Sequence, residues 1–254
     1  NGVVQASSIA YSEIYSDSDS VDDADATGGG TTTAKAWGIN VSGNNALVIN
    51  AGVLDVNASA TAKGNSRADS GGDGYGEAIF ETNSNADAIG ISAGDGGLVW
   101  NQAQAQITAD AKAMVDASAN GDEFGTMGTN KENPGAMAVA KAVGISMGEG
   151  DNQIVNDGSV SVSAEGNINV GTRSLSTTRS THTSTWARAD STATGFSTGK
   201  GNTSITNTGG LEVDAKAIAY LNDPNSGWGT YWRSDSWYNA DAKTGAYAYS
   251  DAKG

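Results

Sequence analysis

Apolar and polar residues alternate strictly along much of this chain. Residues 54–60, for example, read Leu-Asp-Val-Asn-Ala-Ser-Ala. A period of two places successive side chains on opposite faces of an extended backbone, which is typical of a β-strand with one buried face. The alternation therefore predicts an all-β fold.

The chain repeats itself at a period of about fifty residues. Four segments share the pattern Ala-x-Gly-(Ile/Phe), at 36–39, 88–91, 142–145 and 193–196, and each is followed by a turn rich in Gly, Asn and Asp. After each turn comes an Asn, at Asn50, Asn101, Asn156 and Asn207, with spacings of 51, 55 and 51 residues. Such self-similarity is the signature of a repeat architecture.

The positions after each Asn also match when the four repeats are aligned on it. The residues two positions after the Asn are Gly52, Ala103, Gly158 and Gly209, and those four positions after it are Leu54, Ala105, Val160 and Leu211. The residues six positions after it are Val56, Ile107, Val162 and Val213, and those eight positions after it are Ala58, Ala109, Ala164 and Ala215. If each coil lies about 4.8 Å from the next, equivalent side chains stack. The alignment predicts stacks of like residues, including a ladder of the four Asn side chains.

These features predict a parallel β-helix, or β-solenoid, in a single domain of about five repeats, over residues 1–50, 51–101, 102–156, 157–207 and 208–254. A repeat of 51 residues has a perimeter near ~170 Å, so it forms either one flattened coil with Ala-lined arms or two coils. Sheets faced with Ala can approach closely, which favours the flattened coil. The 35 Gly residues would also suit a flexible linker, but a linker has no reason to keep Val and Ile in phase.

Charge and composition narrow the possible partners. The chain has 29 acidic and 14 basic residues, a net charge of −15, and no Cys. So acidic a surface argues against nucleic acid as a partner and makes cation binding a natural expectation. No stretch approaches the roughly 20 apolar residues that span a bilayer, so no membrane span is expected.

The two ends of the sequence match the same point of the repeat. The alternating residues Gly2, Val4, Ala6, Ser8 and Ala10 match the stretch that begins at Gly52, and Thr-Gly-Ala at 244–246 resembles Thr-Gly-Phe at 194–196. Neither end has an atypical capping repeat, which solenoids normally need. We therefore expect either head-to-tail stacking of copies into a homopolymer or a slice of a longer protein.

In most repeats acidic residues recur after the long strand, in segments expected to be loops (16–30, 64–76, 120–135 and 222–239). If the coils stack, these acids fall along one edge of the molecule. Oxygen ligands on irregular Gly-rich loops suit calcium, although a solvated acidic edge would have the same composition. The candidate calcium ligands are Asp17, Asp19, Asp22, Asp23, Asp69, Asp73, Glu77, Asp122 and Glu123.

Two further sets of residues are candidates for contacts. The segment 228–238 holds three of the six Trp residues and is interpreted first as a contact between subunits, second as a glycan contact, and otherwise as a local core. Its candidate residues are Trp228, Tyr231, Trp232, Trp237 and Tyr238. Three sequons, beginning at Asn40, Asn57 and Asn202, are candidate glycan acceptors.

Enzyme signatures are weak in this sequence. His182 is the only His, so a Ser-His triad or a His-based metal centre has little support. We expect a structural protein that is not an enzyme. Two other classes remain open: a polysaccharide-acting β-helix enzyme would need two close, desolvated carboxylates in a groove, and a monomeric glycan-binding adhesin module would line a cleft with the Trp residues.

The stretch 201–215, Gly-x-Asn-x-x-Ile-x-Asn-x-Gly-x-Leu-x-Val-x-Ala in outline, resembles the repeats of Gram-negative autotransporter passengers and filamentous-haemagglutinin-type adhesins. The resemblance covers about half of each repeat. It implies a parallel β-helix, export to the bacterial surface, and an adhesive or scaffolding role, with surface glycans as possible partners. The long Ala-rich arms and acidic segments depart from that family pattern.

Overall fold

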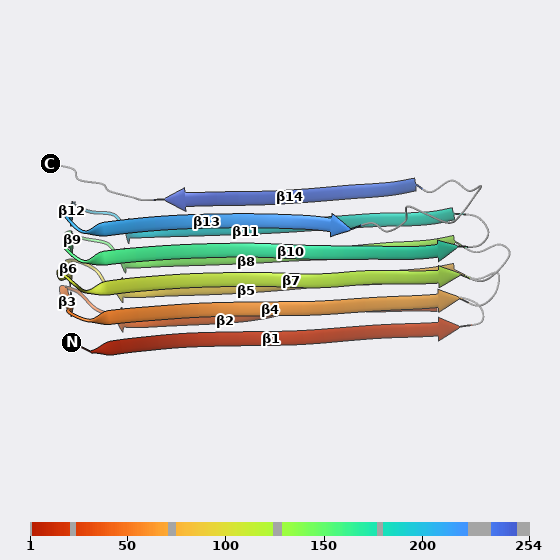
Figure 1. The fold of residues 1–254 in the computed structure, drawn as a ribbon, viewed down its shortest axis with the longest axis horizontal. Helices are drawn as coiled ribbons and strands as arrows, with labels where there is room; N and C mark the ends of the chain where they lie inside the picture. Colours follow the sequence, from red (N-terminus) through yellow and green to blue (C-terminus); the bar gives the residue numbers. More distant parts are fainter. Residues whose placement is uncertain are drawn as a thin grey trace.

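The computed structural model describes residues 2–20, 24–70, 75–123, 129–176, 180–222 and 235–247, and the side chains of residues 2–20, 24–69, 77–119, 135–171 and 186–220. These residues form strands joined by short turns, and their strands lie in three parallel sheets (Figure 1). The described part of the chain contains no helix that could cross a membrane. The predicted all-β parallel solenoid is confirmed.

The two larger sheets run the length of the molecule. Sheet A consists, in order, of β1 (Val3–Ser20), β4 (Val53–Ser70), β7 (Gln106–Glu123), β10 (Ser159–Ser176) and β13 (Gly210–Asn222). Sheet B consists, in order, of β2 (Ala24–Val41), β5 (Tyr75–Ala93), β8 (Thr129–Met147), β11 (Ser180–Thr198) and β14 (Asp235–Tyr247). Both sheets are parallel throughout.

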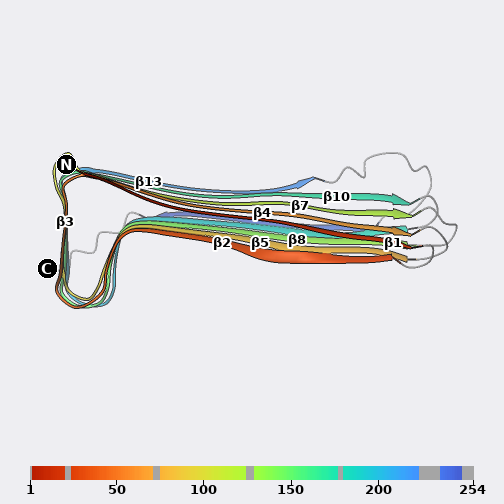
Figure 2. The ribbon, with the colours of Figure 1, turned by 90° about the horizontal axis from the view of Figure 1, so that it is seen from below.

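Short strands close each coil at one end. Sheet C consists of β3 (Ala46–Asn50), β6 (Gly97–Asn101), β9 (Asn152–Asn156) and β12 (Thr203–Asn207). A repeat therefore contributes one strand to each sheet: outward along sheet A, back along sheet B, and across sheet C (Figure 2). The preference for one flattened coil per repeat is confirmed.

Small inward side chains let sheets A and B lie close together along the arms. Ala60, Ala86, Ala113 and Ala138 are fully buried between them. The hydroxyl of Ser84 on sheet B donates to the carbonyl oxygen of Ala60 on sheet A at 2.8 Å. Because one Ser side chain spans the gap, larger inward residues along the arms would force the sheets apart.

The core widens where sheet C joins the arms, and larger side chains fill it. The residues that fill it expose at most 1% of their surface: Leu54, Ile107, Ile145 and Phe196. The Gly of the Ala-x-Gly-(Ile/Phe) motif faces this cluster: a Cβ on Gly90 would lie 2.5 Å from Gly144 O and 2.5 Å from Ile107 Cγ2. Because the motif Gly has no side chain, the opposite sheet and the next coil can approach closely at this position.

Most of the expected stacks are present. Ala36 pairs with Ala88, and Ile91 with Ile145, as the repeated motif predicted. Val4 pairs with Leu54, which places the start of the chain at the point of the repeat expected from Gly2 and Gly52.

The alignment of the second repeat was wrong by two residues. Leu54 pairs with Ile107 and Val56 with Ala109, instead of Ala105 and Ile107. The turn after Asn101 is two residues longer than its counterparts and contains Gln104 with a φ of 71°. Because an insertion of two preserves the alternation of inward and outward positions, the sequence pattern did not reveal it.

The alignment of the last repeat was also wrong. Gly245 pairs with Thr192, and Ala246 with Ala193, so Gly245 does not occupy the position of Gly195. In this register Ala240 and Ala242 pair with Ala187 and Ala189, whose side chains are buried. The pairing of Ala with Ala along β14 thus outweighs the short Thr-Gly match.

The acidic loops were predicted too long. β1 continues to Ser20 and β2 begins at Ala24, so most of the segment 16–30 is strand, and 64–76 and 120–135 are likewise mostly strand. Ser16 and Ser18 keep the inward positions and Asp17 and Asp19 the outward ones. Polar but small inward residues maintain the two-residue period, so the pairing continues where hydrophobicity ends.

Candidate functional site

The four repeat Asn residues form a hydrogen-bonded ladder inside the column. Asn50 Nδ2 donates to Asn101 Oδ1 at 2.8 Å, Asn101 Nδ2 to Asn156 Oδ1 at 2.7 Å, and Asn156 Nδ2 to Asn207 Oδ1 at 2.7 Å. Asn101 and Asn156 have no exposed surface. Each of these three amide nitrogens donates to the following coil, so the ladder gives the column a direction.

Among the residues whose side chains are described, the hydrophobic core is only partly covered at both ends of this column. In the middle coils the inward residues are buried, as in Ala60 and Ala113. In the first coil Ala6 and Ala10 are only partly buried, and at the other end the same holds for Leu211 and the inward residues that follow it on β13. Among the described strands, β1 and β2 are outermost at one end and β13 and β14 at the other (Figure 1). An outermost strand leaves one row of backbone donors and acceptors open to another strand.

Exposed large hydrophobic side chains gather on the same end strands. Among the residues whose side chains are described, these exposed residues are Val3, Val4, Ile9, Tyr11 and Tyr15 on β1, Trp37 on β2, Leu47 and Ile49 on β3, and Ile218 and Tyr220 on β13. All belong to the first coil or to the last strand of sheet A. Contiguous exposed apolar surface marks an interaction site.

The two end surfaces of sheet A complement each other when the register of the column is continued. Extending the existing pairing places Leu211 of one copy over Val4 of the next, and Ala217 over Ala10. On the outer face, Lys216 would lie over Ile9, while the acids Glu212 and Asp214 would lie over Gln5 and Ser7. On sheet A the described positions of this junction therefore bring no like charges together. On sheet B the same continuation places Asp235 over Asp25, a pair of like charges.

Comparison with known proteins adds no family to this picture. No family model, curated protein or solved structure matches the chain. The function is therefore inferred from the geometry of the column.

The candidate calcium ligands are only partly within the described residues. Asp17 and Asp19 lie exposed on β1, Asp69 lies on β4 beside the Arg67 guanidinium, with which it forms an ion pair, and Glu77 begins the described side chains of β5. In the described part of the chain, no three His, Cys, Asp or Glu side chains group so that they could hold a metal ion. Asp22, Asp23 and Asp73 lie outside the described residues, as do the side chains of Asp122 and Glu123.

Backbone register nevertheless brings three of these acids side by side. Asp19 pairs with Asp69, and Asp69 with Asp122, on the outer face of sheet A. The neighbouring position pairs Asp17 with Arg67, which introduces one positive charge beside them. Elsewhere on the outer faces opposite charges alternate, as where Glu165 binds Lys112 at 3.4 Å and Lys216 at 3.7 Å. The three neighbouring acids at 19, 69 and 122 therefore differ from these pairs of opposite charge.

The aromatic candidates lie largely outside the described residues. This holds for Trp228, Tyr231 and Trp232, whereas the backbones of Trp237 and Tyr238 belong to β14, opposite Ser184 and Thr185. The subunit-contact interpretation of this segment stays a prediction.

The three sequons lie on the surface of the column. Asn40 is exposed near the end of β2, and Asn202 is exposed in the turn before β12. Asn57 is partly exposed on the outer face of β4 and donates to Asp55 at 3.0 Å. Glycan attachment at all three stays a prediction.

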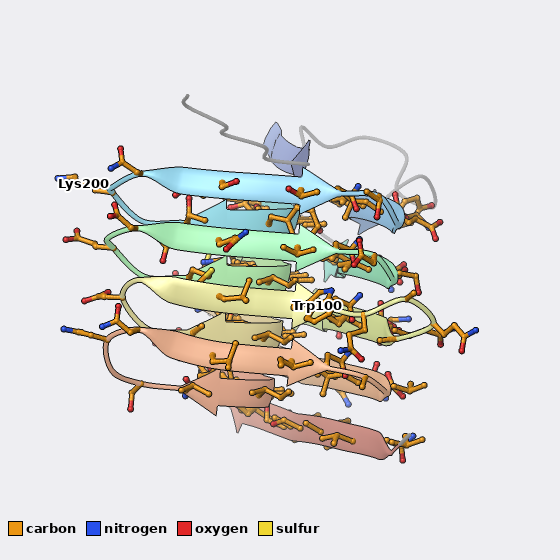
Figure 3. All side chains as sticks on the ribbon, turned by 90° about the vertical axis from the view of Figure 1, so that its left-hand side faces the viewer. Trp100 and Lys200 are labelled. Carbon is orange, nitrogen blue, oxygen red and sulfur yellow. The ribbon has the colours of Figure 1, made fainter. Side chains whose placement is uncertain are left out.

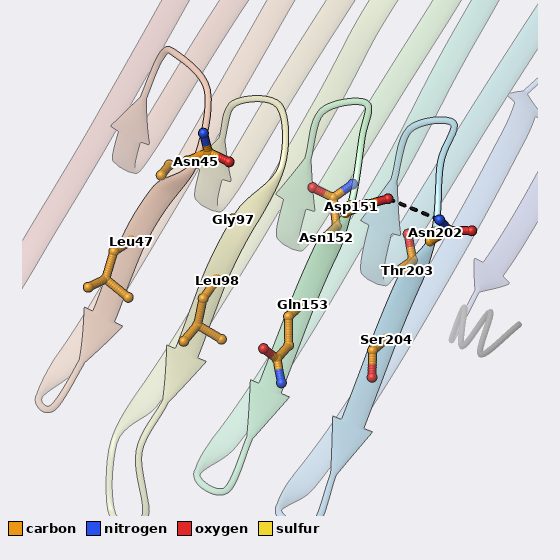
Figure 4. A pocket seen from close by; sticks show the side chains of 11 residues that line it. Asn45, Leu47, Gly97, Leu98, Asp151, Asn152, Gln153, Asn202, Thr203 and Ser204 are labelled. Atoms are coloured by element: carbon orange, nitrogen blue, oxygen red, sulfur yellow. Dashed lines mark hydrogen bonds between the residues drawn. The ribbon is translucent and has the colours of Figure 1, made fainter. Parts of the chain in front are cut away.

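A shallow groove of about 660 Å³ crosses the outer face of sheet C (Figure 4). Leu47, Leu98, Gln153 and Ser204 form one row along it, so the row changes from apolar to polar along the column. A smaller depression of about 200 Å³ lies on sheet A beside Tyr15. Both are open surface features.

Trp100 lies on the face of sheet C, beside this row (Figure 3). Its indole nitrogen donates to Asp157 Oδ2 at 2.9 Å, and the Thr208 hydroxyl donates to Asp157 Oδ1 at 2.6 Å. These hydrogen bonds, first that of Thr208 and then that of Trp100, lower the pKa of Asp157. The contact ties β6 to the turns that follow β9 and β12.

Among the described carboxyl groups, that of Asp110 on β7 has a raised pKa. Partial burial raises the pKa of Asp110, and the nearby Asp55 carboxylate raises it further, while a hydrogen bond from Ser163 opposes both. Two carboxylates of this kind are what a polysaccharide-cleaving site would need. However, Asp110 faces outward on sheet A, and neither the groove on sheet C nor the depression beside Tyr15 includes it or Asp55.

Sequence reasoning missed the apolar residues on the outer face of the end strands. On the outer face of β1, Tyr11 and Tyr15 are interspersed with Glu13 and Asp17, so the sequence there looks like that of an ordinary strand. The signal that distinguishes them is their position: in the middle coils the positions equivalent to Tyr15 are Asn65, Ser118 and Gly171. A comparison of outward positions across repeats would have identified the end strands as different.

Proposed function

We propose that this protein is a structural subunit of an extracellular or cell-surface fibre, assembled by head-to-tail stacking of its coils. The observation that carries the proposal is the state of the column ends. Open strand edges, a partly exposed core and the exposed large hydrophobic side chains all occur there together. Such ends are a template for pairing with another chain, and a second copy is the partner whose strands continue the register of sheet A without bringing like charges together there.

The direction of the column supports head-to-tail over head-to-head stacking. All sheets are parallel and the Asn ladder donates in one direction, so the two ends differ. A contact between different surfaces that does not close on itself generates an open filament. Stacking also removes the exposed apolar surface of both ends at every junction.

An adhesive role, surface glycans as partners, and calcium as a stabilising ion are further parts of this proposal. The resemblance to autotransporter and haemagglutinin repeats supports the first two. The adjacent acids at 19, 69 and 122 support the third, because like charges in neighbouring strands repel unless a cation intervenes. A structural role is preferred to a catalytic one because Asp110, the carboxyl group with a raised pKa, lies outside both the groove on sheet C and the depression beside Tyr15.

Variants that block one end each provide the test. Val4→Lys places a charge in the inward stack of β1, and Ala215→Pro removes a backbone donor from β13. Gly210 N bonds to Gly158 O on β10, so by alternation the N–H of residue 215 faces the open edge, and its loss spares the β10 pairing. We expect wild-type filaments, monomers of each variant alone, and dimers when the two variants are mixed.

Electron microscopy and light scattering read the assembly state, and circular dichroism establishes that both variants keep their β-structure. The mixture is the decisive arm, because each variant retains the end that the other lacks. Filaments from either folded variant, or a mixture that stays monomeric while the wild type polymerises, would contradict head-to-tail stacking. Repeating the wild-type arm with a chelator tests calcium separately.

A further inference from the structure

The outer faces of the two end strands carry aromatic and aliphatic residues that the core does not use. Tyr11 and Tyr15 project from β1, with 57% and 59% of their surfaces exposed, and Ile218 and Tyr220 project from β13, with 36% and 58% exposed. We infer that these four residues form a second, external contact between stacked copies, here named the outer seal. This inference rests on the proposed function, whose junction it specifies.

Continuing the register of sheet A brings the four residues together. Tyr11 pairs with Thr61, and the same stack continues through Met114 and Asn167 to Ile218, so the next Tyr11 would lie directly over Ile218. Tyr220 lies two residues further along β13 and would be placed over Glu13, between Tyr11 and Tyr15. Aromatic and β-branched side chains in adjacent or diagonal positions stabilise a pair of strands.

The middle coils show that these positions do not need apolar residues for the coil itself. In the stack that ends in Tyr220, the middle strands carry Lys63, Asp116 and Asn169. In the stack from Tyr11 to Ile218 they carry Thr61, Met114 and Asn167, of which Met114 is apolar. The aromatic residues Tyr11 and Tyr220 lie at the open edges. Their placement fits a contact that forms only when another copy covers that edge.

The two Tyr side chains of β1 are already held in place. Tyr11 OH donates to Glu13 Oε2 at 2.8 Å, and Tyr15 OH donates to Asp17 Oδ2 at 3.2 Å. Lys63 Nζ lies 5.9 Å from the centroid of the Tyr11 ring, on the side of the next coil. Lys63 comes from β4, so the opposite side of Tyr11 faces the open edge. Side chains held in this way lose little further freedom when a partner packs on them.

Cysteine crosslinking tests the outer seal directly, since the chain contains no Cys of its own. In the double variant Tyr11→Cys/Ile218→Cys, the two Cα atoms at a junction would lie about 4.8 Å apart, within disulfide range. The matched controls Ile9→Cys/Ile218→Cys and Glu13→Cys/Ile218→Cys are each displaced by two residues, which gives about 8 Å. Such a separation cannot be bridged without movement of the backbone.

Oxidised filaments of the first variant are expected to give a ladder of covalent oligomers on denaturing gels, formed at least about tenfold faster than in either control. Separately, Ile218→Ser is expected to raise the critical concentration for assembly about two- to fivefold, whereas Asn167→Ser, in the same stack of a middle coil, leaves it unchanged. Equal or faster crosslinking in a control, or an unchanged critical concentration in Ile218→Ser, would overturn the outer seal while filaments still support the proposed function. Absence of wild-type filaments would overturn the proposed function itself.

Discussion

Gly90→Val is expected to prevent the middle coils from closing, and it is the substitution for which we expect the largest loss of stability. A Cβ at residue 90 would lie 2.5 Å from Gly144 O in the next coil and 2.5 Å from Ile107 Cγ2 in the opposite sheet. The first neighbour is backbone and cannot turn away, so the strands must separate. Overpacking of this kind costs about 3 kcal/mol or more. Urea unfolding followed by circular dichroism measures the change.

Gly210→Ala is the matched control for this prediction. Its Cβ would meet Ser159 Cβ at 3.7 Å, an ordinary van der Waals contact. We expect a change within about 0.5 kcal/mol, because the strand keeps its neighbours and gains a side chain. If Gly90→Val unfolded at the wild-type urea concentration, the close approach of coils and sheets at this position would be wrong.

Asn101→Ala is expected to cost about 2 to 4 kcal/mol in the free energy of unfolding. The substitution leaves Asn50 Nδ2 without its acceptor at 2.8 Å and Asn156 Oδ1 without its donor at 2.7 Å. Residue 101 is fully buried, so water does not replace either partner, and each unsatisfied polar group costs about 1–3 kcal/mol. Asn202→Ala, at an exposed residue that donates to Asp151, is the control and is expected to change little.

Asn101→Asp separates the ladder from simple loss of volume. At neutral pH the new carboxylate is buried and faces Asn156 Oδ1, so its pKa is expected to rise above the usual range. The protonated form can donate to Asn156 Oδ1 as the amide did, so the variant is most stable at low pH and loses stability as the pH rises through the raised pKa. Thermal melts of this variant at several pH values, compared with Asn101→Ala, measure the effect. Equal pH dependence in the two variants would contradict a hydrogen-bonded ladder.

The architecture could be predicted because the role of each repeated residue depends on its own position in the strand or turn. The repeat Asn recurs at 50, 101, 156 and 207, and the Ala-x-Gly-(Ile/Phe) motif recurs before it. Each recurrence places the same kind of side chain at the same position of the coil. Alternation then assigned inward and outward faces, because the two-residue period of a strand is strict.

The register and the strand ends were harder to predict, for a related physical reason. The two extra residues before Gln106 leave every inward residue inward, so hydrophobicity cannot detect them. Ser16 and Ser18 are polar yet small enough for the narrow arm, so the strand continues where composition suggests a loop. Pairing with a neighbouring strand, which a single repeat does not reveal, decides both.

The candidate site was foreseen in part. Open ends were expected from the match of both termini to one point of the repeat, a match that the register supports at the N-terminal end and contradicts at Gly245. The outer seal was not expected, because Tyr11 and Ile218 come together only across a junction between copies, and within one copy they lie at opposite edges of sheet A.

Cryo-electron microscopy of the assembled wild-type protein tests the central claim most directly. Sheet A contributes five strands per copy, so a filament of stacked copies would have strands perpendicular to its axis, about 4.8 Å apart, and an axial repeat of about 24 Å. Density with this repeat and with β13 beside β1 of the next copy is the predicted result. Dispersed monomers, or filaments whose strands run along the axis, would contradict the account.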